Sequence, residues 1–126
     1  MTQPTAEKKT GLSAPAQTIR ETIDTALEED GVAILPPLDV EKTIILSHSL
    51  GYSFKTTILD PWYNKGVGGE RDDYEEFILK ILNASGRVSE HIYLWGFPEI
   101  IAPIVGKIPS NLELACWLTW FYKNNP

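Results

Sequence analysis

The chain alternates between strand-like and helix-like segments, and this alternation constrains its fold more than any other feature. Three segments have the composition or the pattern of strands: 53–59, 91–95 and 112–122. The first two are rich in β-branched or aromatic residues, and the third alternates apolar residues with others. The shorter apolar run 32–35 also predicts a brief strand. Strands separated by helices at this spacing predict an α/β fold with a mainly parallel sheet.

Four segments carry apolar residues at helical spacing. We expect helices over 15–29, 39–50, 72–86 and 98–105. The third is the clearest, because its apolar residues form one unbroken stripe: Tyr74, Phe77, Ile78, Ile81 and Leu82. The middle of the second helix is also rich in β-branched residues, which leaves a strand open there.

Polar residues and glycines mark the ends of these helices. Asp39 is an expected N-cap, because its short side chain can accept a hydrogen bond from the first turn. Asp72, with Glu75 three residues later, predicts a capping box. Gly51 and Gly86 follow the last residues of two helices, where glycine commonly ends a helix.

The composition limits which cellular compartment and which binding partners we expect for the protein. The chain has 126 residues and a net charge of −6. It therefore lacks the excess of Lys and Arg that is typical of a protein that binds DNA by itself. Its one cysteine, Cys116, cannot form an internal disulfide, and no apolar stretch is long enough to span a membrane. We expect a cytoplasmic protein with a flexible tail over 1–14 and one partial α/β domain over 15–126.

Two segments are expected to meet at one edge of the sheet. Ligands of open α/β sheets bind just beyond the carboxyl ends of the strands. Asp60 follows the expected strand 53–59, and Gly96 follows the expected strand 91–95. If these strands are neighbours, the segments that follow them line the same edge.

The segment after the first of these strands has the chemistry of a base-binding site. It consists of Asp60, Pro61, Trp62, Tyr63 and Asn64. A carboxylate and fixed carbonyl groups suit an exocyclic amino group, and an aromatic ring suits stacking on a flipped nucleobase. In the structural alternative, the aspartate only caps a turn and the two aromatic residues pack in the core.

This segment resembles the Asp-Pro-Pro-Tyr motif of DNA amino-methyltransferases, which methylate adenine N6 or cytosine N4. The likeness extends over residues 54–126, because 91–99 and 118–126 resemble later strands of that family in the same order. It implies a three-layer, Rossmann-like SAM-methyltransferase fold, of which this chain would be a part. It also implies S-adenosyl-L-methionine (SAM) as the cofactor and DNA as the substrate, commonly within a restriction-modification system.

The resemblance assigns catalytic roles to three residues. Asp60 would accept hydrogen bonds from the target amino group, and the carbonyl of Pro61 would orient its nitrogen toward the methyl group of SAM. Tyr63 would stack on the flipped base. The methyl group would pass directly to the nitrogen, so catalysis would depend on positioning. An aspartate at the first position favours adenine N6 over cytosine N4.

Further residues are candidates for binding DNA and cofactor. Trp62 and Asn64 lie within the motif and would contact the base. Lys65 and Arg71 flank a glycine-rich loop and would contact DNA phosphates. For the cofactor, Asp60 is a candidate together with Gly96, the glycine that follows the second strand.

The chain departs from the family pattern in two respects. Trp62 stands where the family usually has a second proline, and no Phe-x-Gly-x-Gly segment for SAM follows a strand. We therefore expect the chain to be inactive alone. DNA would bind through a missing recognition region, and a second chain would complete the SAM site.

Other functions remain open at this stage. A non-catalytic α/β interaction module derived from a methyltransferase is the main alternative, and a small hydrolase using Asp60 is a weaker one. The loop 65–71 could cradle a phosphate with its backbone amides, although it lacks the Walker pattern. His48 and His91 form no metal-binding motif, so we expect no metal site.

Overall fold

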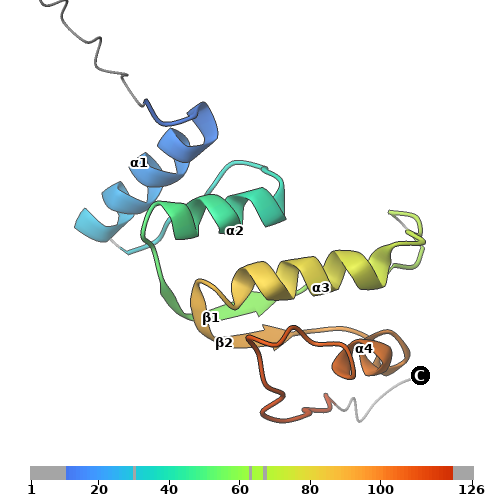
Figure 1. The fold of residues 1–126 in the computed structure, drawn as a ribbon. Coiled ribbons are helices and arrows are strands. Elements are labelled where there is room, and N and C mark those ends of the chain that lie inside the picture. The colour runs from blue at the N-terminus through green and yellow to red at the C-terminus, as the bar shows by residue number, and fades with distance from the viewer. Residues whose placement is uncertain (1–10, 30, 63, 67, 121–126) are drawn as a thin grey trace, which may run out of the picture. The chain divides into compact units, whose positions relative to one another are not determined.

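The computed structural model describes residues 11–29, 31–62, 64–66 and 68–120 (Figure 1). The chain divides into two compact units, residues 1–52 and 53–126. The first unit contains two helices, and the second contains two strands and two helices among the described residues.

The first unit is a pair of helices. Helix α1 (Ala14–Glu28) and helix α2 (Val40–Ser49) confirm the two helices expected here. The Asp39 side chain accepts a hydrogen bond of 2.8 Å from the amide of Lys42, so the expected N-cap is also confirmed. Three small or apolar residues of α1 are buried: Ala16, Ile19 and Ala26.

The strand expected over 32–35 is wrong. This segment is irregular, and the side chains of Val32 and Ile34 are 66% and 84% exposed. A strand needs a hydrogen-bonded neighbour, and the elements assigned within the described part of this unit are both helices. An apolar composition alone therefore does not produce a strand here.

The second unit contains a parallel β-α-β arrangement. Strand β1 (Phe54–Leu59) pairs in parallel with strand β2 (Ser89–Leu94), and helix α3 (Tyr74–Ser85) connects them. Helix α4 (Pro98–Val105) follows β2 directly (Figure 1). The α/β class, the parallel pairing and all four of these elements agree with the sequence analysis. Over the described residues the sheet has these two strands.

One apolar cluster forms the core of the second unit. It contains three residues of α3 and one of α4: Tyr74, Ile78, Leu82 and Ile104. Half-buried residues of the strands pack against it, among them Leu59, Ile92 and Leu94. Burial along the ends of both strands alternates, so that Ile58 and Tyr93 are exposed. The core thus lies on one side of the strand pair.

The last expected strand, 112–122, is also wrong over the residues that the structure describes. Residues 112–120 are assigned to no strand, and 113–120 are all exposed. Residues 121 and 122 lie outside the described part. The segment alternates as strands do, but in the described structure β2 pairs with β1 alone. Alternation of apolar residues predicts which side chains would share a face of a strand. It does not show that a neighbouring strand is present for pairing.

Helix α3 begins one residue later than the expected capping box requires. Its N-cap is Asp73, which makes no side-chain cap hydrogen bond, so the prediction for Asp72 is wrong. The carboxylate of Asp73 instead binds the guanidinium of Arg71. The expected end of the helix is confirmed, because Gly86 is its C-cap.

Candidate functional site

The carboxyl ends of β1 and β2 lie side by side, as the sequence analysis required for a shared edge. Leu59 is paired with Leu94, and the amide of Trp95 donates a hydrogen bond of 2.9 Å to the carbonyl of Leu59. Asp60 and Gly96 therefore follow neighbouring parallel strands at the same edge. Both residues are exposed to solvent.

Trp62 anchors the turn after β1 to helix α3. Its ring meets Tyr74 edge-on, with centroids 5.3 Å apart, and lies 5.7 Å from the ring of Phe77. Its carbonyl accepts a hydrogen bond of 2.7 Å from the hydroxyl of Tyr74, and its indole nitrogen donates one of 3.4 Å to the carbonyl of Gly69. The half-buried tryptophan thus packs against α3, as in the structural alternative. Tyr63 lies outside the described residues.

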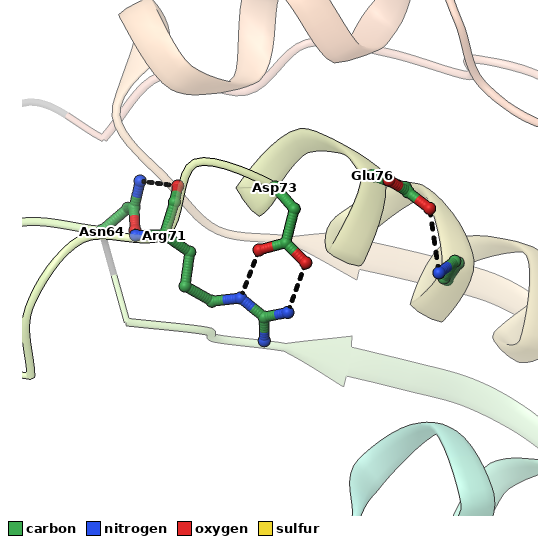
Figure 2. A network of polar contacts seen from close by, with 5 residues as sticks. Asn64, Arg71, Asp73 and Glu76 are labelled. Carbon is green, nitrogen blue, oxygen red and sulfur yellow. Dashed lines mark hydrogen bonds and ion pairs between the residues drawn. The ribbon is translucent and has the colours of Figure 1, made fainter.

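The side chain of Asn64 closes the following loop. Its amide nitrogen donates to the carbonyl of Arg71 at 3.1 Å, and its oxygen accepts from the Arg71 amide at 2.6 Å (Figure 2). Asn64 has a φ of 56°, in the left-handed region that asparagine tolerates better than most residues. Both functional groups of the side chain are therefore used within the loop, which makes Asn64 a structural residue in this state.

Arg71 is held by the helix that follows it. Its Nε and one terminal nitrogen each donate to the carboxylate of Asp73 at 2.7 Å (Figure 2). The guanidinium also lies 4.5 Å from the centre of the Phe77 ring. The paired hydrogen bonds raise the pKa of Arg71 and lower the pKa of Asp73. Arg71 is thus bound on two sides by residues of its own segment.

Lys65 connects the two segments that line the edge. Its Nζ lies 2.8 Å from Oε1 of Glu99, in the first turn of α4. The same ammonium lies 4.7 Å from the centre of the Phe97 ring, which precedes that helix. The hydrogen bond from Lys65 lowers the pKa of Glu99. The loop after β1 and the segment after β2 are therefore joined by an ion pair.

Gly96 has a structural explanation that involves no cofactor. A Cβ atom at this position would lie 2.6 Å from Cδ1 of Ile101 and 2.8 Å from its Cγ1. The isoleucine belongs to α4, so the glycine permits a close approach between that helix and the end of β2. A larger residue would require the Ile101 side chain to move.

Three residues that bind the candidate residues were not predicted as part of the site. Tyr74 was assigned only to an apolar stripe, although its hydroxyl fixes the turn at Trp62. Asp73 and Glu99 were not singled out, although each neutralises a candidate phosphate contact. The available signal was weak: each acidic residue lies close to a helix start, where an acidic side chain is common for other reasons.

Each unit has a shallow hollow. One runs along α1 and is lined by Glu21, Thr25 and Val32, among others. The other lies at the opposite end of the strand pair, next to Phe54 and Val88. Among the described residues, no three potential metal ligands come together.

Comparisons with known proteins do not place the chain in a family. No family model, no curated protein and no solved structure matches it. Over its described part, none of the helices combines the length and apolar character that a membrane crossing requires.

Proposed function

We propose that this chain is the catalytic-motif portion of a SAM-dependent DNA amino-methyltransferase that acts on adenine N6. One observation carries the proposal: Asp60 and Gly96 follow adjacent parallel strands and share one exposed edge. This is where open α/β sheets bind their ligands. The site would hold a flipped base, with its amino group directed at the carboxylate of Asp60.

The chemistry at this edge would depend on hydrogen bonding and stacking. Asp60 and the carbonyl of Pro61 would accept hydrogen bonds from the amino group and so direct its lone pair outward. Tyr63 would stack on the base. SAM, when bound, would supply the methyl group, and the residues of the edge would hold the amino nitrogen for direct transfer. Asp60 is an exposed residue at this edge, in keeping with the proposed role.

The contacts of Trp62 support a positioning role in place of a direct contact with the base. The family has a proline at this position, and proline stiffens a turn. Here the turn is held by the packing of Trp62 on Tyr74 and Phe77 and by the hydrogen bond to its carbonyl. This anchoring would replace the rigidity that the second proline supplies.

The complete enzyme would contain more than this chain. A three-layer Rossmann-like sheet has more strands than β1 and β2, and the SAM motif of the family is absent from the sequence. We propose that a second chain or a further region supplies the remaining strands, the SAM site and the recognition of DNA. A cytoplasmic location within a restriction-modification system would fit this division.

Calorimetric titration with SAM tests the proposal. The chain alone is expected to show no binding, and the chain mixed with the product of a neighbouring gene is expected to bind SAM and to methylate DNA. Asp60→Asn is expected to abolish methyl transfer in that complex while SAM binding persists. Asp72→Asn is the matched control, because it removes the same charge outside the motif. Failure to bind SAM with any such partner would contradict the proposal.

Exposed apolar residues favour a second candidate, a non-catalytic interaction module. They lie on the outer side of the strand pair and along 114–120: Ile58, Tyr93, Trp95, Leu114, Trp117, Leu118 and Trp120. Parallel sheets are normally covered on both faces, and large exposed apolar patches often bind other proteins. Sedimentation velocity tests this candidate: a monodisperse monomer that binds no hydrophobic dye would argue against it.

A further inference from the structure

The two cations of the loop after β1 are both paired with carboxylates, but they are held differently. Arg71 makes two parallel hydrogen bonds to Asp73 and lies over the Phe77 ring. Lys65 also lies over a ring, that of Phe97, but makes a single hydrogen bond, to Glu99. A bidentate guanidinium is fixed in orientation, whereas a lysine ammonium on a flexible stem changes partners easily. Lys65 is therefore the more exchangeable of the two.

The Lys65–Glu99 pair lies at the proposed base-binding edge. Lys65 belongs to the loop after β1, and Glu99 belongs to the first turn of α4, after β2. The two side chains are 52% and 60% exposed, so solvent and ligands reach both. A phosphate that approaches this edge encounters a lysine that already binds an anion.

We propose that Glu99 is a built-in competitor for Lys65, which holds the lysine in the resting protein and is displaced by a DNA phosphate on binding. The inference rests on the proposed function, since it concerns the same edge and the same ligand. The displaced carboxylate stays close to the bound phosphate and repels it. Glu99 therefore weakens the binding of DNA and makes Lys65 available only to a ligand that other contacts also hold.

Glutamate-to-glutamine substitutions remove a charge and keep the shape of the side chain. They can therefore separate competition for Lys65 from the effect of the net charge on DNA binding. Glu99→Gln leaves an oxygen that can accept from Lys65 and removes the competing charge. Glu90→Gln is the matched control, because Glu90 also faces a lysine, Lys55, at 3.8 Å, but near the start of β2. Both variants lower the net negative charge by the same amount.

The experiment is fluorescence anisotropy of a labelled short DNA duplex titrated with the full chain at low salt. Under this condition non-specific binding through phosphate contacts is measured without the region that would recognise the DNA sequence. Glu99→Gln is expected to tighten binding about threefold to tenfold more than Glu90→Gln does, as for removal of one competing charge. It is also expected to steepen the decrease of the DNA-binding constant with salt concentration, by about the release of one further counterion. In a Lys65→Gln background the gain from Glu99→Gln is expected to vanish, because the two residues act through one contact.

Each alternative result overturns a specific statement. If the wild type binds the duplex through Lys65 and Glu99→Gln gains no more than Glu90→Gln, the competition is wrong and the proposed DNA site stands. If the wild type binds no duplex at low salt, or if Lys65→Gln leaves binding unchanged in every background, both the competition and the placement of DNA at this edge are wrong. Retention of the wild-type unfolding midpoint in each variant shows that the fold is intact.

Discussion

The hydroxyl of Tyr74 donates a hydrogen bond of 2.7 Å to the carbonyl of Trp62, and so ties the first residue of α3 to the turn after β1. Tyr74 is buried, and its ring also meets the Trp62 ring edge-on. The turn that begins the candidate site is thus fixed by the same residue that starts the core stripe of the helix. Packing of the core and geometry of the edge are therefore linked through one side chain.

Removal of this hydroxyl is expected to destabilise the second unit. Tyr74→Phe leaves the ring in place and removes one hydrogen bond, which should lower the free energy of unfolding by about 1 kcal/mol. Urea denaturation followed by tryptophan fluorescence measures this unit specifically, because all four tryptophans lie in residues 53–126. Tyr93→Phe, at an exposed tyrosine of β2, is the control and should change little. Equal effects of the two changes would contradict the role of the Tyr74 hydroxyl.

A second prediction concerns the division of the strand pair into a covered and an uncovered side. Ile78 is 2% exposed in the core cluster, whereas Ile58 is 67% exposed. Ile78→Ala should lower the free energy of unfolding by about 2–5 kcal/mol, and Ile58→Ala should cost well under about 1 kcal/mol. The same fluorescence measurement compares them. A large loss at Ile58 in the isolated chain would mean that the outer side is covered.

The elements that were predicted correctly are those whose signal is local. The stripe of α3 and the composition of β1 and β2 are contained within single segments, and their order alone indicates that the ends of the strands meet. The strands expected over 32–35 and 112–122 failed because pairing depends on a distant neighbour. Local composition cannot show whether such a neighbour is present.

The candidate site was predictable to a similar extent. The shared edge of Asp60 and Gly96 follows from the chain order and the rule for parallel sheets. The inward packing of Trp62 was one of two alternatives that the sequence left open, and the ion pair between Lys65 and Glu99 did not follow from the sequence. These contacts depend on where α3 and α4 lie relative to the loop, which only the folded arrangement defines.

A third prediction tests the closure of the loop by Asn64. The amide of Arg71 donates to the Asn64 side chain, so Asn64→Ala should expose this amide and speed its hydrogen exchange by about tenfold or more. Asn64→Gly tolerates the left-handed backbone but lacks the side chain, and should expose the Arg71 amide equally. Exchange is measured by NMR, with the Lys42 amide, capped by Asp39, as an internal control. Unchanged exchange at Arg71 would rule out the closure.

The last prediction is an acid dependence of the second unit that arises from the Arg71–Asp73 pair. The hydrogen bonds from Arg71 lower the pKa of Asp73 in the folded state. A carboxyl whose folded pKa is lowered stabilises the fold above its unfolded pKa, near about 3.9, and loses that contribution as the pH falls through the folded pKa. Stability should therefore decrease as the pH is lowered below about 4, and high salt should weaken the effect because the pair is exposed. Asp73→Asn should reduce this dependence, whereas Asp72→Asn should leave the contribution of the Arg71 pair in place. A carboxyl titration of Asp73 by NMR at or above the ordinary aspartate value would show that the pair does not form in solution.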